Sequence, residues 1–305
     1  MIQIENENFS AAIRRKGAEL ASLKHKASGC ELIWQAVPEI WGGSAPILFP
    51  IVGKLKNDKT IIGGTEYEIP KHGLIRHMDA TPIEQTEDSA RLRFESNFPE
   101  SEAIDNFAES KITTAGSGST LEKYPFPFVF DVIFRLTETG LAVDYEITNS
   151  GEETMRFTLG SHPAFALDEV MGSSIEFSQP ETLDLYGLNS KGLIFKRVNR
   201  WFKRESLIQL TDRIFNDDAL IFQHIKSHSI RLYTAGDRPN LEVDMRNHPH
   251  LGLWAKPGAK FVCIEPWYGF NDASKSDGIF ENKPSMLTLS AGRTFETGYG
   301  ITVTP

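Results

Sequence analysis

Short runs of β-branched, aromatic and alternating apolar residues recur along the chain, and turn residues separate them. These runs span residues 9–13, 61–69, 90–94, 128–136, 141–148, 154–159, 230–233, 241–245 and 261–264. Alternation with a period of two, bounded by glycine, proline, asparagine or aspartate, predicts β-strands. Glu138-Thr139-Gly140 lies between two of the runs and predicts a hairpin turn.

Helical periodicity is scarce. Residues 105–112 and Ala164–Leu167 are compatible with short helices, and residues 113–120 predict an exposed loop. Tyr124–Phe128 is apolar and predicts a return of the chain to the core. Many strands with almost no amphipathic helices predict an antiparallel sandwich or barrel, and not a parallel α/β sheet.

The length indicates a large sandwich. At one strand per 8–12 residues, the 305 residues correspond to about twenty or more strands. No linker or internal repeat divides the chain. We therefore predict an all-β protein with one domain over residues 1–305, a large antiparallel β-sandwich.

Composition narrows the classes of partner. The chain has 32 basic and 41 acidic residues and a formal charge of −9, which disfavours nucleic-acid binding. The N-terminal residues lack a basic region followed by an apolar run, and no stretch approaches the roughly 18–20 apolar residues of a membrane helix. Cys30 and Cys263 form neither a disulfide framework nor a zinc-ligand pattern. We expect a cytoplasmic monomer or homodimer that binds neither nucleic acid nor membrane.

Three segments place titratable side chains at predicted strand ends. His72 and Arg76 lie in Lys71–His77, where a polar turn with solvated side chains is the alternative. His162 ends an apolar run before a proline, and a buried histidine of the core is its alternative. Glu265 continues an apolar strand, so burial would raise its pKa; a surface position on an edge strand is its alternative.

Carboxylate and imidazole groups at strand ends favour general acid/base chemistry. Trp254, Trp267, Tyr268 and Phe165 are suited to stacking on a sugar ring, although aromatic residues are more often part of a core. No nucleophile elbow, phosphate loop or dinucleotide fingerprint is present.

Four short motifs occur in the order seen in the aldose 1-epimerase (galactose mutarotase) family, which the chain resembles from about residue 9 to 300. The motifs are Phe49–Lys54, His72–Arg76, Ser161–Phe165 and Cys263–Trp267, and Tyr124-Pro125-Phe126 is similar to a fifth. The resemblance implies a β-sandwich with a sugar cleft on a concave sheet, an aldose 1-epimerase activity on a hexose, and no cofactor or metal.

The resemblance also implies roles for single residues: His162 as general acid, Glu265 as general base, and His72, Arg76, Lys54 and Asp218 as sugar-binding residues. Asp217 is a rival to Asp218, because adjacent residues of a strand point to opposite faces.

The substrate is open between a free hexose and a hexose 6-phosphate. Lys54 stands where the family commonly has arginine, and Trp41-Gly42-Gly43 stands where related hexose-6-phosphate epimerases carry Arg-Gly-Gly. A single cation, Arg76, holds a phosphate less securely than a cluster does. These departures and the negative charge favour a free sugar. A non-catalytic sugar-binding module is one alternative, and a metal enzyme that uses His72, His77, His162 and Glu265 is another, although this spacing matches no ligand motif.

Overall fold

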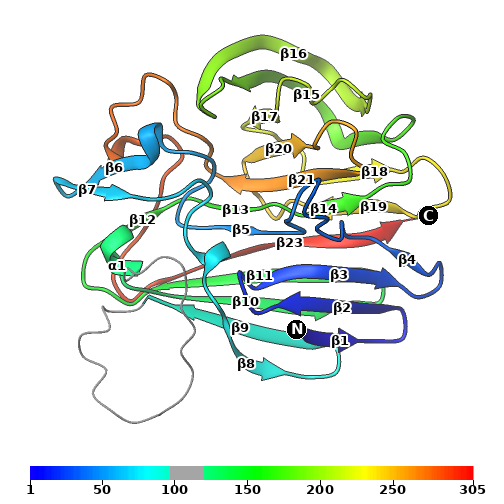
Figure 1. Cartoon of the computed structure of the whole chain (residues 1–305), viewed down its shortest axis with the longest axis horizontal. Helices are drawn as coiled ribbons and strands as arrows, with labels where there is room; N and C mark the ends of the chain where they lie inside the picture. The colour runs from blue at the N-terminus through cyan, green and yellow to red at the C-terminus, as the bar shows by residue number, and fades with distance from the viewer. Residues whose placement is uncertain (97–119, 305) are drawn as a thin grey trace.

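β-Strands make up most of the described chain. The computed structural model describes residues 1–96 and 120–304, which contain 23 strands. All pairings between these strands are antiparallel, and the sheets stack as layers, which confirms the predicted large sandwich (Figure 1). The predicted helix over 105–112 and the predicted loop over 113–119 lie outside the described residues.

Fifteen strands form one sheet. Its main path runs β5 (Ile47–Leu48), β13 (Leu159–Ser161), β21 (Phe261–Tyr268), β20 (His250–Trp254), β17 (Leu220–Gln223), β15 (Ser174–Leu188), β18 (Ser229–Tyr233), β19 (Asn240–Asp244), β23 (Thr294–Thr304), β11 (Gly140–Asn149), β10 (Phe128–Leu136), β9 (Ser89–Glu95) and β8 (Thr81–Gln85). Off this path, β14 (Ala164–Ala166) pairs with β21, and β16 (Ile194–Gln209) pairs with β15.

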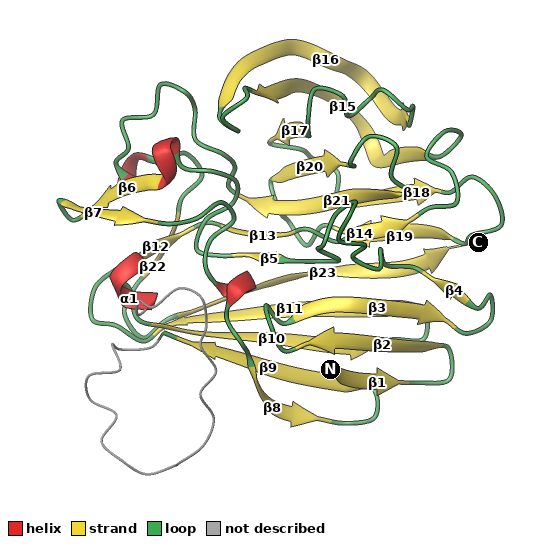
Figure 2. Ribbon diagram, in the orientation of Figure 1, coloured by secondary structure: helices red, strands yellow, loops and turns green. Residues whose placement is uncertain are grey.

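Smaller sheets and short helical turns complete the described structure. A four-stranded sheet contains β1 (Ile2–Glu5), β2 (Phe9–Arg14), β3 (Glu19–His25) and β4 (Cys30–Glu31); two-stranded sheets pair β6 (Lys59–Ile62) with β7 (Thr65–Glu68) and β12 (Met155–Phe157) with β22 (Leu287–Leu289). The helical segments are α1 (Thr120–Lys123) and the 3-10 turns η1 (Lys56–Asp58), η2 (Ile75–His77) and η4 (Phe280–Asn282) (Figure 2). None of the helices within 1–96 and 120–304 is long and apolar enough to cross a membrane.

The sandwich core lies between the four-stranded sheet and strands β9–β11. Strand β1 contacts β9 and β2 contacts β10, as the overlap of these layers in Figure 1 suggests. Phe9 from one layer and Phe94, Phe130 and Tyr145 from the other are each at most 1% exposed. Alternation in β9 and β11 sends one set of side chains inward, and this burial is the main favourable term in folding.

The predicted hairpin turn is confirmed. Leu136 of β10 faces Leu141 of β11, and the Thr137 N–H donates a 2.9 Å hydrogen bond to the Gly140 carbonyl between them. The predicted return of the chain to the core at Tyr124–Phe128 is also confirmed, since Tyr124 and Phe128 are at most 1% exposed.

One local prediction is wrong, and two of the predicted runs are each divided between two strands. Ala164–Leu167 is not a helix, because Ala164–Ala166 forms β14 and pairs with Phe261–Cys263 of β21. The run over 61–69 is interrupted at Gly63-Gly64, where both glycines have positive φ and β6 turns back as β7. The run over 154–159 divides into β12 and β13, which join different sheets.

Strand β21 lies inside the large sheet. It pairs with β13 and β14 on one side and with β20 on the other, and all its residues except the last are buried. Such complete burial suits its nearly continuous apolar sequence and leaves Glu265 as a carboxyl group in an apolar strand.

Candidate active site

A cavity of about 350 Å³ opens where β21, the end of β13 and the loop from β7 to η2 meet. It gathers five of the predicted site residues from segments far apart in the sequence. Its lining consists of Trp41, Lys71, His72, Arg76, His162, Leu188, Asp218, Ala219, Ile221, Trp254, Glu265, Trp267 and Asn271.

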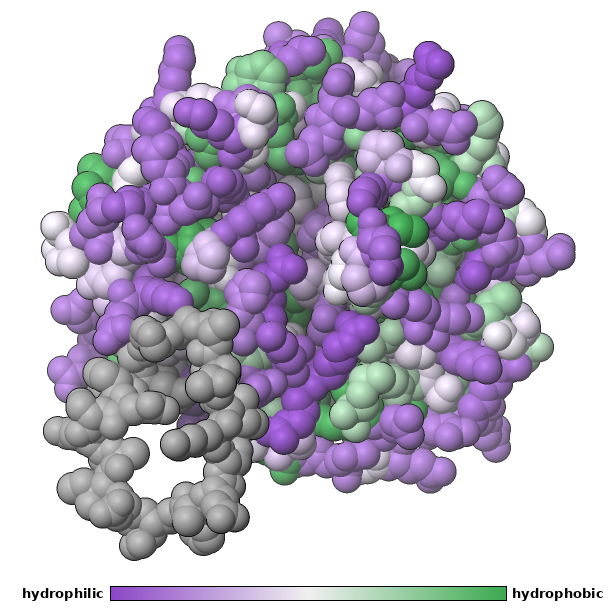
Figure 3. Space-filling model, in the orientation of Figure 1, coloured by the Kyte–Doolittle hydropathy of each residue, from purple (hydrophilic) through white to green (hydrophobic). Residues whose placement is uncertain are grey.

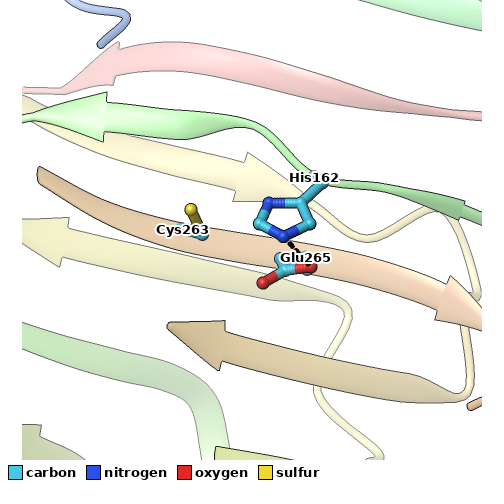
Figure 4. A group of neighbouring side chains, drawn as sticks. All are labelled: His162, Cys263 and Glu265. Carbon is cyan, nitrogen blue, oxygen red and sulfur yellow. Dashed lines mark ion pairs between the residues drawn. The ribbon is translucent and has the colours of Figure 1, made fainter. Parts of the chain in front are cut away.

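His162 and Glu265 face one another within this cavity. The Nε2 atom of His162 lies 3.2 Å from Oε2 of Glu265, and Figure 4 shows the imidazole ring directed at the carboxyl group. The Ile264 N–H donates a 3.2 Å hydrogen bond to the Pro163 carbonyl, which ties the segment after His162 to the strand that carries Glu265. Two strands therefore hold the pair at a fixed separation.

Burial controls the charge of Glu265. Its side chain is 1% exposed, and burial raises its pKa well above the usual value; Lys71 opposes this shift and Asp218 adds to it. The contact with His162 lacks hydrogen-bond geometry, and Oε2 has no hydrogen-bond partner among the described residues. A buried carboxyl oxygen without a hydrogen-bond partner costs free energy of folding. A ligand that donates a hydrogen bond to Oε2 would recover this cost.

His162 is also held uncharged by its surroundings. Burial, followed by the charges of Arg76 and Lys71, lowers its pKa to about 3. Trp41 stacks on the imidazole at 5.0 Å between ring centroids, and Trp254 meets it edge-on at 5.9 Å. Both shifts favour a neutral imidazole and a protonated carboxyl group, so the pair's shared proton resides on Glu265.

His72 lies beside His162, with 5.7 Å between ring centroids. Its Nδ1 accepts a 3.2 Å hydrogen bond from the Gly53 N–H, so the neutral ring carries its proton on Nε2. Burial lowers the pKa of His72 well below its usual value, and Lys71 and His162 add to this effect. Gly73 has φ +80°, and a Cβ atom there would lie 2.1 Å from the Phe49 carbonyl oxygen, so only glycine permits this close backbone approach.

The structure separates the two candidate aspartates. Asp218 lines the cavity, whereas the exposed Asp217 does not. Both lie in the turn that precedes β17, so the alternation of a strand does not decide between them. Asp218 has φ +84°, and its Oδ1 accepts a 2.9 Å hydrogen bond from the Ala219 N–H.

Lys54 is outside the lining of this cavity. Its ammonium group lies 3.2 Å from Oδ2 of Asp58, and its carbonyl accepts a hydrogen bond from the Asp272 N–H. Its sugar-binding role stays a prediction.

Comparisons with known proteins identify the family of the chain. The aldose 1-epimerase family profile matches residues 1–274. The chain belongs to this family.

Relatives of this epimerase-family chain are similar over their whole length. The plasmid-encoded LacX protein of Lactococcus lactis subsp. lactis is 29% identical over 316 residues, which cover 99% of each sequence. A galactose mutarotase-related enzyme of Lactobacillus acidophilus is 31% identical with a TM-score of 0.87, over 100% of this chain and 97% of that one. A galactose mutarotase-like protein of Lactobacillus casei is 25% identical with the same TM-score, over 100% of both chains.

The first cavity contains residues that sequence reasoning did not single out. Lys71 lay inside a segment recognised for its histidines, and Trp41 lay in the Trp-Gly-Gly segment considered only for its missing arginine. Asn271 gave no pattern signal; its amide donates a 2.8 Å hydrogen bond to the Gly192 carbonyl across 79 residues.

The aromatic residues suggested for stacking divide into two groups. Trp254 and Trp267 line the cavity of this epimerase-family protein. Tyr268 instead contacts His248 at 4.4 Å between ring centroids, and Phe165 is fully buried in the core.

A second cavity of about 300 Å³ shares Arg76 with the first. It is lined by Arg14, Lys16, Gly17, Glu19, Gly42, Gly43, Pro46, Arg76 and His77. Glu19 pairs with Arg14 at 3.0 Å, whereas Lys16 and Arg76 have no carboxylate within ion-pair distance in the described part of the chain. Burial lowers the pKa of His77, so the charge here comes from lysine and arginine.

Proposed function

We propose that the protein is a cofactor-independent aldose 1-epimerase that interconverts the α and β anomers of a hexose. The observation that carries this proposal is that His162 and Glu265 lie 3.2 Å apart in the lining of a cavity large enough for a single sugar ring. Membership of the aldose 1-epimerase family supports it.

The reacting form of the pair is a Glu265 carboxylate with a protonated His162. This form has the same number of protons as the neutral pair, since the two states differ by one transfer between Oε2 and Nε2. A bound sugar brings polar hydroxyl groups into the cavity, which stabilise the charged form, and Lys71 favours the carboxylate of Glu265.

Ring opening then requires two proton movements. Glu265 removes the proton from the anomeric hydroxyl while His162 donates a proton to the ring oxygen, and the bond between C1 and the ring oxygen breaks. Rotation about C1–C2 presents the other face of the aldehyde, and closure returns both protons. Each positioned acid or base typically contributes about 10²–10⁴-fold to the rate.

The surrounding side chains orient the sugar. His72 presents Nε2–H as a hydrogen-bond donor, and Asp218 offers carboxylate oxygens to hydroxyl groups. Trp41, Trp254 and Trp267 supply apolar faces against which a sugar ring stacks.

Exchange NMR on α/β mixtures of common hexoses tests this function. We expect wild type to accelerate anomer exchange, and Glu265→Gln and His162→Asn each to lower that rate about 10²–10⁴-fold without changing the circular dichroism spectrum. The exposed Glu152→Gln and His228→Asn serve as matched controls and should retain wild-type rates. Sugar binding without faster exchange in wild type would favour the non-catalytic module instead.

A hexose 6-phosphate is a second candidate substrate, and one observation favours it. Arg76 lines both cavities, Lys71 lines the first and Lys16 lines the second. The cations therefore extend from the cavity that contains His162 and Glu265 into the neighbouring cavity. Sequence reasoning counted a single cation here, whereas a cluster holds a phosphate more securely. The same NMR screen with glucose and galactose 6-phosphates ranks the two substrate classes by kcat/KM.

A further inference from the structure

A thiol lies beside the acid/base pair. Ligand atoms of His162, Cys263 and Glu265 all lie within 4.8 Å of one another, and all three residues are buried (Figure 4). Cys263 and Glu265 are two residues apart on β21 and therefore project to the same face. We propose that these three side chains form a binding site for Zn²⁺, and that the bound ion inhibits the enzyme by occupying the acid/base pair.

The donor set suits zinc. Imidazole nitrogen, thiolate sulfur and carboxylate oxygen are the usual zinc ligands, and three protein ligands leave a fourth position for water. Tetrahedral bonds of about 2.0–2.3 Å separate neighbouring ligand atoms by about 3.3–3.6 Å. The 3.2 Å between His162 Nε2 and Glu265 Oε2 already matches this edge, so only the Cys263 sulfur has to approach, by roughly 1 Å.

One ligand atom of the trio is buried and lacks a partner. Glu265 Oε2 has no hydrogen-bond partner within residues 1–96 and 120–304. A buried polar atom without a partner calls for a ligand, and a cation satisfies the carboxylate directly. Because His162 and Glu265 both line the first cavity, an ion reaches the site through the opening that admits substrate.

Binding exchanges protons for metal and involves no redox change. The Cys263 thiol loses its proton to solvent as the sulfur–zinc bond forms, and any proton on Glu265 leaves in the same way. The ion then holds the lone pairs that would otherwise accept the substrate proton. Binding of the metal does not depend on the proposed function, whereas inhibition does.

Cobalt titration of the full chain tests the site independently of activity. Co²⁺ bound to a thiolate gives a charge-transfer absorption in the near ultraviolet, and Zn²⁺ should displace it. We expect the band in wild type, its loss in Cys263→Ala and Cys263→Ser, and its retention in Cys30→Ala, which removes the other free cysteine. The paired substitutions guard against misfolding of one variant, which circular dichroism checks.

Anomer exchange measured with added Zn²⁺ tests inhibition. We expect the concentration for half-inhibition to rise at least about tenfold in Cys263→Ser, with metal-free turnover unchanged. A wild type without the cobalt band, or a band that survives loss of Cys263, would overturn the proposal. A wild type that shows the band but no turnover on any sugar would refute the proposed function and leave the metal site standing.

Discussion

At the scale of single residues, burial is the property that makes His162 and Glu265 an acid/base pair. Ordinary pKa values would place the proton on histidine and leave the carboxyl group ionised at neutral pH. In this cavity burial shifts both groups toward their uncharged forms, so transfer of the proton from Oε2 to Nε2 creates two buried charges and becomes favourable only when a bound ligand stabilises them. We therefore describe the pair by the total number of protons that the two side chains hold.

The pH profile of kcat/KM should report this shared proton. The pair holds one proton above the depressed pKa of His162, about 3, and below the raised pKa of Glu265. We expect activity to be flat from neutral pH down toward about 4 and to fall on the alkaline side as Glu265 loses the proton. Initial rates from exchange NMR or polarimetry between pH 4 and 10 measure the profile. An acid limb near 6.5, the usual histidine value, would contradict this view of the pair.

The sequence motifs identified several residues that line the cavity, but they did not identify all of them. Glu265 and His162 were recognisable because a carboxyl group in an apolar strand and a histidine at a strand end are locally unusual. Asn271 was not, because its partner at Gly192 is 79 residues away, and only the folded chain brings them together. Lys54 carried a motif signal, yet it pairs with Asp58 four residues later.

At the scale of elements, the site depends on irregular backbone between strands. His72 has φ +68° and Gly73 φ +80°, and this turn brings His72 against the Gly53 amide. Left-handed backbone costs energy for residues other than glycine, so the surrounding contacts must hold His72 in place.

Gly73→Ala tests this turn. The added Cβ would meet the Phe49 carbonyl oxygen at 2.1 Å, so we expect a loss of at least about 1 kcal/mol in the free energy of unfolding and a clear drop in turnover. Gly63→Ala is the matched control, because Gly63 also has positive φ but would meet nothing within 4 Å. Thermal unfolding and exchange rates measure both variants. Equal losses in the two variants would mean that backbone strain alone, without the close approach, explains the effect.

Strands of the main layers were predictable and the long outer pair was not. Residues 128–136 and 141–148 alternate clearly because one face of β10 and β11 is buried. Strands β15 and β16 arch over one end of the sheet in Figure 1, and most residues of β16 are exposed. Their pairing contains several register shifts, so no period of two persists in the sequence.

At the scale of the whole molecule, global and local charge differ in sign. The chain carries −9, and hydrophilic side chains cover most of the face shown in Figure 3. The two adjoining cavities nevertheless contain Lys71, Arg76 and Lys16 without carboxylate partners in the described structure. The negative net charge favoured a neutral sugar over a phosphorylated one. Net charge does not report where the cations lie, so it could not reveal this local positive cluster.

Lys16→Gln distinguishes the substrate classes, since Lys16 lines the second cavity and not the first. If a phosphate occupies the second cavity, kcat/KM for a hexose 6-phosphate should fall several-fold while kcat/KM for the free hexose stays unchanged. Added salt should reproduce this selective loss in wild type, because screening weakens an attraction that acts over roughly 10 Å at 0.1 M. Lys24→Gln, which removes an exposed lysine of β3, is the matched control and should leave both values unchanged. Equal kcat/KM values for Lys16→Gln and wild type on the phosphorylated sugar would exclude the second cavity as a phosphate site and leave the free hexose as the favoured substrate.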